Sequence, residues 1–215
     1  MGRVIAVRRV RAYIGLGANV GDAGATLAAA VHALAALPRT RLAGVSSLYA
    51  TDPVGVLDQP EFRNAVVALD VPAGPDPATG ASALLVALKA LEQAFGRRPR
   101  ERWGPREVDL DLLVFGRHRI RVARPPAGAS PNPAKAALEL IVPHVEARRR
   151  LFVLAPLQEL APGLVPPGWG ETVATVAARR REQEGPDAAR PIASWDGSGW
   201  RPLARSADPA GARVG

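Results

Sequence analysis

The sequence contains no cysteine, so it offers neither disulfide bonds nor thiolate metal ligands. Lysine is also scarce: of the 28 basic residues, only Lys89 and Lys135 are lysines. No apolar stretch is long enough to span a bilayer, and the short apolar run near the N-terminus does not reach the length of a secretory signal. These absences predict a cytoplasmic protein that does not contact a membrane.

The rest of the composition is that of a globular protein. The chain has 215 residues, of which 47% are hydrophobic, and this is enough for one domain with a sizeable core. Its formal net charge of +8 could attract nucleic acid or a polyanionic small molecule. We attribute the total charge to a compositional bias toward arginine, and we predict no nucleic-acid partner because the basic, aromatic-rich sheet of an RNA-recognition module is missing.

A predicted strand that begins at Val108 carries the clearest chemical signal. Its apolar residues Val108, Leu110 and Leu112 point one way, while Asp109 and Asp111 point the other. At about 3.3 Å per residue, the attachment points of the two carboxylates lie about 6.6 Å apart, so both can reach a shared cation. Aspartate is depleted in strands, and paired carboxylates suit Mg²⁺.

A cluster of arginines precedes this strand in the sequence: Arg97, Arg98, Arg100, Arg102 and Arg106. Their guanidinium groups supply the donors that a phosphate chain requires. Acidic metal ligands and basic phosphate ligands in one segment predict phosphoryl-transfer chemistry.

Hydrophobic periodicity and turn residues predict the element order β-α-β-β-α-β. The predicted strands cover residues 11–17, 43–51, 64–71 and the Asp109/Asp111 strand, and the predicted helices lie between Asp22 and Pro38 and between Pro77 and Gly96. This order is that of ferredoxin-like folds, an α+β class in which the helices cover one face of an antiparallel sheet. The spacing of Gly15, Gly17 and Gly21 misses the dinucleotide-binding fingerprint by one residue, which argues against a Rossmann site.

The C-terminal part is predicted to add helices to this core. We predict a flexible insertion over 117–138, helices over 145–161 and 171–183, with Pro156 limiting the first, and a disordered tail over 185–215. The predicted catalytic domain therefore covers 1–184. Trp195 and Trp200 lie in the predicted tail and could dock back onto the domain. The chain has no obvious interface stripe, so we expect a monomer.

Several single residues remain open on the sequence alone. Lys89 and Glu92 lie beside the apolar stripe of the second helix, and the pattern favours a solvated face for both. Phe62 and Phe152, taken alone, are more typical of ordinary core residues. His144, taken alone, is more typical of a surface residue.

One long ordered string resembles a known family. R-W-G-P-R-x-x-D-L-D, at residues 102–111, resembles the signature of 6-hydroxymethyl-7,8-dihydropterin pyrophosphokinase (HPPK), an enzyme family of folate biosynthesis. Supporting strings are Y-I-G-L-G-A-N at 13–19, T-D-P-V-G at 51–55, D-Q-P at 58–60, V-P-H at 142–144 and R-L-F-V-L-A-P-L at 150–157. The resemblance runs from about residue 12 to about residue 182, with the predicted insertion as an interruption.

The resemblance implies transfer of the β,γ-diphosphate of ATP to the hydroxymethyl oxygen of the pterin, with AMP as the leaving group. It implies two Mg²⁺ ions held by Asp109 and Asp111, and it assigns catalytic roles to these two residues and to Arg97 and Arg106. The implied ATP contacts are Lys89, Glu92, Arg97, Arg100, Arg102, Trp103, Asp109, Asp111, Leu112, His144 and Arg150. The implied pterin contacts are Thr51, Asp52, Val54, Phe62, Asn64, Trp103, Arg106, Asp109 and Phe152.

Two other functions compete with this one. The arginine cluster could belong to a non-catalytic RNA- or nucleotide-binding module, but paired carboxylates in a nucleic-acid groove would repel phosphate. A Mg²⁺-dependent transferase acting on another alcohol would share the metal site. The aromatic residues and Asn64 favour a planar heterocycle over a sugar as the acceptor.

Overall fold

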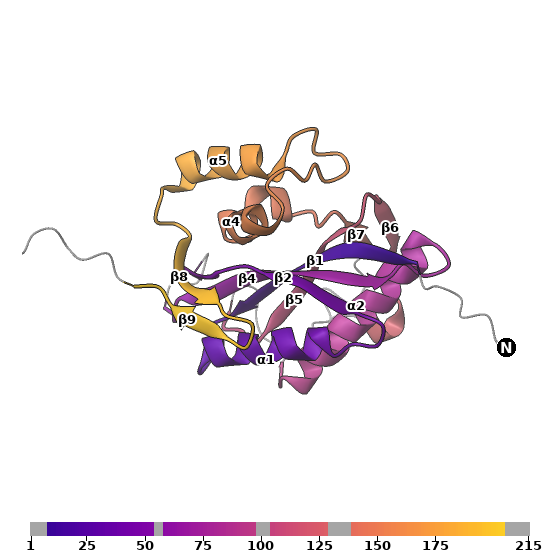
Figure 1. Ribbon diagram of the computed structural model, residues 1–215, viewed down its shortest axis with the longest axis horizontal. Helices are drawn as coiled ribbons and strands as arrows, with labels where there is room; N and C mark the ends of the chain where they lie inside the picture. Colours follow the sequence, from indigo (N-terminus) through magenta and orange to yellow (C-terminus); the bar gives the residue numbers. More distant parts are fainter. Residues whose placement is uncertain (1–7, 54–57, 98–103, 129–138, 205–215) are drawn as a thin grey trace, which may run out of the picture.

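The computed structural model describes residues 8–53, 58–97, 104–128 and 139–204, and it contains a central antiparallel sheet with helices on both faces (Figure 1). The strands are β1 (Arg9–Ala18), β2 (Arg41–Val45), β3 (Leu48–Thr51), β4 (Phe62–Pro72), β5 (Asp109–Phe115), β6 (Ile120–Ala123), β7 (Glu139–Val142), β8 (Arg190–Trp195) and β9 (Trp200–Pro202). The α-helices are α1 (Ala23–Ala35), α2 (Pro77–Ala94), α4 (Leu151–Leu160) and α5 (Val173–Glu184). None of these helices is long and apolar enough to cross a membrane.

The predicted β-α-β-β-α-β core is confirmed. The sheet has the order β5-β1-β4-β3, with β2 also paired to β4, and every pairing in it is antiparallel. Aspartates cap both core helices, and the sequence predicted the first of them. Asp22 accepts a hydrogen bond from the backbone of Ala25, and Asp76, which the sequence analysis did not single out, accepts one from the backbone of Thr79. Each cap satisfies a backbone N–H in the first turn of its helix and so fixes where α1 and α2 begin.

The second predicted strand is divided into β2 and β3 at Ser46. The hydroxyl of Ser46 accepts the hydrogen bond of Val66 N at 2.9 Å, so a side chain takes the place of a backbone acceptor there. The backbone N–H of Ser46 still donates to the Val66 carbonyl. Strand β3 pairs with β4 along one edge and with β8 along the other.

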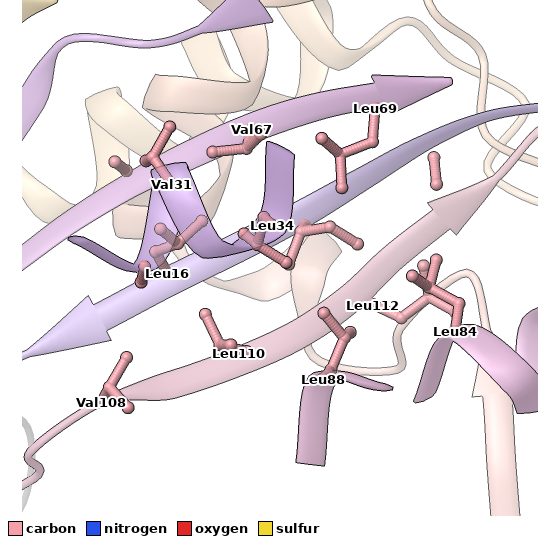
Figure 2. Packing of buried hydrophobic residues seen from close by; sticks show 14 of the residues in the cluster. Leu16, Val31, Leu34, Val67, Leu69, Leu84, Leu88, Val108, Leu110 and Leu112 are labelled. Atoms are coloured by element: carbon pink, nitrogen blue, oxygen red, sulfur yellow. The ribbon is translucent and has the colours of Figure 1, made fainter. Parts of the chain in front are cut away.

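The larger core lies between the sheet and the helices α1 and α2. Figure 2 shows Val108, Leu110 and Leu112 pointing toward this cluster, which also contains Leu84 and Leu88 of α2. All five are at most 7% exposed. Since neighbouring side chains in a strand point to opposite faces, Asp109 and Asp111 must face away from this core.

Helix α4 lies on the opposite face of the sheet, and α5 packs against α4 (Figure 1). Tyr13 of β1, Val66 of β4 and Val114 of β5 point to this side and pack with Leu154 and Leu157 of α4. Pro156 lies inside α4 and does not end it, contrary to the sequence-based expectation. The helix is only ten residues long and packs against the sheet, so packing outweighs the hydrogen bond that the proline lacks.

The prediction of a flexible insertion over 117–138 is wrong for the part that the structure describes. Strand β6 pairs with β7 in a two-stranded sheet, from Ile120 opposite Val142 to Ala123 opposite Glu139. Gly128 is buried and lies against Leu85 of α2. Proline-rich composition suggested disorder, but pairing with a segment that is distant in sequence supplies the missing backbone partners. Residues 129–138 lie outside the described residues.

The prediction of a disordered tail over 185–215 is wrong for residues 190–202, which form the hairpin β8–β9. Strand β8 adds to the edge of β3, and Trp200 donates from its indole nitrogen to the Ser46 carbonyl at 2.9 Å. The Trp195 ring contacts Trp200 edge-on, with 4.8 Å between ring centroids, and also contacts His32 of α1. Asp196-Gly197 between two tryptophans is a hairpin signal that glycine- and proline-rich composition concealed. Residues 205–215 lie outside the described residues.

We therefore expect a chain that ends at Gly185 to be destabilised, whereas a disordered tail, as the sequence predicted, would not affect stability. Removing β8 exposes the edge of β3 and uncovers apolar surface around His32 and Ser46. The expected loss is about 3 kcal/mol, or about 10 °C in Tm for a domain of this size. Thermal unfolding against a chain that ends at Ala204, which keeps the hairpin, measures the difference. Equal Tm values for the two chains would contradict the expectation.

Candidate active site

The two aspartates of β5 lie on the face of the sheet that carries α4 and α5. Asp111 is exposed, whereas the Asp109 side chain is 32% exposed with its Oδ1 atom fully buried. Gly15 and Gly17 of β1 lie directly opposite Asp111 and Asp109 in the register of the sheet. The two carboxylates therefore border a strand that has no side chains on the same face at these positions.

Two arginines converge on Asp109 from different segments. Arg97, which follows α2, places Nη2 2.6 Å from Asp109 Oδ1, and Arg106 places Nε 3.5 Å from Asp109 Oδ2. Both arginine side chains are only 10% exposed. Burial raises the pKa of Asp109 to about 6; Arg97 opposes this shift, while Asp111 and Glu92 add to it. The arrangement brings together guanidinium groups that could bind a phosphate and carboxylates that could bind a cation.

Glu92 of α2 connects Arg97 of this cluster to α2 and β5 through hydrogen bonds. Its Oε1 accepts hydrogen bonds from Lys89 Nζ at 2.6 Å and from the backbone N–H of Leu110 at 2.7 Å, and its Oε2 accepts one from Arg97. Lys89 also donates to the Leu110 carbonyl at 3.1 Å. A carboxylate in this position ties α2 to β5 and holds the Arg97 guanidinium in place beside Asp109.

The expectation that Lys89 and Glu92 occupy a solvated face is wrong. Lys89 is 6% exposed and Glu92 is 1% exposed. Helical periodicity identified the leucine stripe but not the strand beside it. Because α2 docks along β5, the edge of the stripe is buried as well, and the two opposite charges satisfy each other there.

Asn19 links the backbone of Arg106 to the segment that contains Gln59 and Pro60. Its side-chain nitrogen donates to Gln59 Oε1 and to the Pro60 carbonyl, each at 3.0 Å. Its Oδ1 accepts from the Arg106 backbone N–H at 2.7 Å, and its own backbone N–H donates to the Arg106 carbonyl at 3.0 Å. Asn19 is 3% exposed, so these bonds fix the position of the Arg106 backbone.

Thr51, Phe62 and Asn64 also come together on the face that carries α4. Thr51 pairs with Phe62 across β3 and β4, and Asn64 Nδ2 donates to Thr51 Oγ1 at 2.8 Å. Phe62 is half-buried, whereas Thr51 and Asn64 are 4% and 5% exposed. Strand alternation places Phe62 and Asn64 on the same face as Val66, which packs against α4.

Segments after β7 bring further predicted residues to the region. The backbone N–H of His144 donates to the Leu113 carbonyl at 2.9 Å, which places the His144 backbone beside β5. Arg150 lies over the Phe152 ring, with its central guanidinium carbon 5.6 Å from the ring centroid. The predicted pterin contact Asp52 comes from a different segment: it follows β3 and is exposed.

Leu112 is buried, as are the predicted ATP contacts Lys89 and Glu92. Its side chain is 2% exposed and packs in the core beneath the sheet. Only its backbone could contact a ligand on the other face. Val54, Arg98, Arg100, Arg102 and Trp103 lie outside the described residues.

Comparison with known proteins identifies the family. The family model described as 7,8-dihydro-6-hydroxymethylpterin-pyrophosphokinase (HPPK) matches residues 13–162. The chain belongs to the HPPK family. It is therefore a pyrophosphokinase of folate biosynthesis that uses ATP, and the resemblance noted in the sequence is confirmed.

Bacterial relatives extend the HPPK match over most of the chain. A 2-amino-4-hydroxy-6-hydroxymethyldihydropteridine pyrophosphokinase of Pseudomonas aeruginosa is 42% identical over 154 residues, which cover 72% of this chain and 82% of the relative. One of the same name from Methylorubrum extorquens is 40% identical over 169 residues, which cover 79% of this chain and 92% of the relative.

Solved HPPK-containing structures confirm the fold. A wild-type HPPK-DHPS of Plasmodium falciparum, solved with pteroate, superposes with a TM-score of 0.64 at 16% identity. The match covers 91% of this chain and 48% of the solved one, so this chain spans about half the length of that protein. At this identity, the likeness establishes the α+β architecture alone.

Sequence reasoning did not assign a role to Asn19 or Gly17, although both lie in the HPPK-like string Y-I-G-L-G-A-N. A buried asparagine beside a turn suggests a structural hydrogen bond, but its partners lie about 40 and 87 residues away. The partners are visible only in the folded chain.

Proposed function

We propose that this enzyme transfers the β,γ-diphosphate of ATP to the hydroxymethyl oxygen of 6-hydroxymethyl-7,8-dihydropterin. The hydroxyl oxygen attacks the β-phosphorus, the bond between that phosphorus and the α,β-bridging oxygen breaks, AMP leaves, and the hydroxyl proton is released. The observation that carries the proposal is the Asp109–Asp111 pair with Arg97 and Arg106 beside it, within the string that matches the family.

The two aspartates fit a Mg²⁺ site. This ion is commonly held by one or two carboxylates together with substrate phosphates and water. Across the described residues there is no group of three or more metal-ligating side chains, so the two carboxylates would depend on the nucleotide to complete the coordination. Bound Mg²⁺ would supply charge neutralisation on the phosphates. Asp109 and Asp111 would hold it, and the exposed Asp111 is open to the nucleotide.

The arginines would bind the transferred group. Arg97 is held by Glu92 and Asp109, and the backbone of Arg106 is held by Asn19. Guanidinium groups that are already in position donate to phosphate oxygens without a large loss of side-chain entropy. They would stabilise the charge that develops as the phosphorus–oxygen bond breaks.

The pterin would be bound next to this site by residues of β3, β4 and α4. A flat heterocycle with donors and acceptors along its edge needs a polar group to read the edge and aromatic rings to cover its faces. Asn64, fixed by Thr51, supplies the polar group, and Phe62 and Phe152 supply the aromatic rings.

Product analysis tests the proposal. The enzyme is incubated with ATP, Mg²⁺ and the reduced hydroxymethylpterin, and the nucleotide product is separated by chromatography. We expect AMP and a pterin diphosphate in equal amounts, and no AMP when the pterin is omitted. Formation of ADP, or no pterin-dependent product, would overturn the proposal.

A further inference from the structure

The two aromatic rings assigned to the pterin come from different layers of the molecule. Phe62 belongs to β4, in the sheet, whereas Phe152 belongs to α4, which packs on the sheet. The gap between the two rings therefore depends on how α4 is held. The apolar contacts of Leu154 and Leu157 keep the helix against the sheet, but such contacts are non-directional and do not fix its position along the strands.

A carboxylate of α4 is bonded to β3 and to the residue just before β3. Glu159 Oε1 accepts a hydrogen bond from the Tyr49 hydroxyl at 2.5 Å, and Glu159 Oε2 accepts one from the backbone N–H of Ser47 at 2.7 Å. Hydrogen bonds to a charged acceptor are directional and roughly twice as strong as those between neutral groups. The two bonds therefore fix the C-terminal half of α4 at one place on β3.

Tyr49 remains a hydrogen-bond donor to Glu159 at neutral pH. Its side chain is 5% exposed. Burial and, after it, the bond to Glu159 raise the pKa of the Tyr49 hydroxyl, while Arg181 opposes the shift. The hydroxyl consequently keeps its proton, and the bond to α4 is present under the conditions in which the enzyme works.

Both ends of this bond lie close to residues assigned to the pterin. In the register of the sheet Tyr49 is directly opposite Asn64, and paired residues point to the same face. Tyr49 also packs in one cluster with Leu151, the residue before Phe152. Glu159 follows Phe152 by about two helical turns, or about 10.5 Å, so the two side chains lie on the same side of α4.

We propose that Tyr49 and Glu159 form a positioning pair for pterin binding: their hydrogen bond fixes α4 on β3 and so sets the distance between the Phe152 ring and the Phe62 ring. The pair acts through α4 and is assigned no contact with either substrate. Without the bond, α4 can shift along β3, and the two rings no longer enclose a flat heterocycle at the same spacing. This proposal rests on the proposed function and adds the contact that holds one side of its site in place.

The variant Tyr49→Phe removes the hydroxyl and keeps the ring. We expect the KM for the reduced hydroxymethylpterin to rise about fivefold or more, while kcat stays within about twofold of the wild-type value. The Kd of a non-hydrolysable ATP analogue should also stay within about twofold, because Arg97 and His144 are bonded to α2 and β5. A loss of stability alone would lower the fraction of folded enzyme, and so kcat, but not KM. An unchanged pterin KM, or an equal rise in the Kd of the ATP analogue, overturns the proposal.

Substitutions of Glu159 test the other half of the pair. They also apply if Tyr49→Phe does not fold, since Glu159 is exposed. Glu159→Ala should raise the pterin KM at least as much as Tyr49→Phe, and the double variant should show no further rise, because both substitutions remove the same bond. Glu159→Gln should keep the pterin KM within about twofold of wild type, because its amide oxygen can accept from Ser47 and its amide nitrogen can donate to the Tyr49 hydroxyl. Rises that multiply in the double variant, or a glutamine variant as impaired as the alanine variant, overturn the pair.

Tyr13→Phe is the matched control. Tyr13 of β1 lies on the same face of the sheet, is 8% exposed and packs with α4, but Glu159 is bonded to Tyr49 instead. We expect a pterin KM close to wild type. An equal rise in both tyrosine variants would show a general sensitivity to changes beneath α4 and would overturn the assignment. A wild-type enzyme that forms no AMP would instead refute the proposed function, so the two failures are distinguishable.

Discussion

Replacing Asp109 or Asp111 by asparagine is expected to lower kcat by about 1,000-fold or more while the fold stays intact. Each substitution removes a charged ligand for Mg²⁺ and keeps the size of the side chain. Burial raises the pKa of Asp109 to about 6 in the folded chain without metal. The folded chain therefore favours an uncharged side chain at this position more than the unfolded chain does, and an asparagine should not destabilise the fold. Asp111 is exposed, so its replacement by asparagine does not bury a polar side chain.

AMP formation under single-turnover conditions measures the loss, and thermal unfolding checks the fold. Electron paramagnetic resonance of Mn²⁺, with a non-hydrolysable ATP analogue present, should report fewer bound ions in each variant. Asp70→Asn is the matched control, because Asp70 pairs with Arg11 and Arg41 on β1 and β2 and should leave kcat unchanged. Wild-type turnover in either β5 variant would remove the metal assignment.

Replacing Glu92 by alanine is expected to reduce the free energy of unfolding by about 3–5 kcal/mol. The substitution leaves the Lys89 ammonium and the Leu110 backbone N–H buried without their shared acceptor, and it removes one of the two carboxylates that hold Arg97. Urea unfolding measures the change. We also expect kcat to fall, because the Arg97 guanidinium is no longer fixed in place.

Gln93→Ala is the matched control for Glu92. Gln93 is the next residue of α2 and is exposed, so its replacement should change the free energy of unfolding by less than about 0.5 kcal/mol. Glu92→Gln distinguishes the effect of side-chain shape from that of charge. Its amide oxygen can still accept the hydrogen bond of the Leu110 backbone, whereas Lys89 and Arg97 lose the negative charge that pairs with them. A Glu92→Ala variant as stable as Gln93→Ala would show that the buried cluster does not join α2 to β5.

The two main errors of sequence interpretation have one physical origin. Lys89 and Glu92 were assigned to solvent because a helical period describes one helix and not the strand that lies against it. The hairpin β8–β9 was assigned to disorder because composition does not reveal that the edge of β3 needs a partner. In both cases the stabilising contact comes from a segment far away in the sequence.

The sequence by itself determined the element order, the cap of the first helix at Asp22 and the opposite directions of Leu110 and Asp109, because these depend on neighbouring residues and on the period of a strand. It also determined the family, through an ordered string that contains both acids. Only the tertiary structure decided that Glu92 holds Arg97 and that Gly17 lies between Asn64 and Asp109. Such pairings depend on strand register and on the docking of α2, which are set by packing across the whole domain.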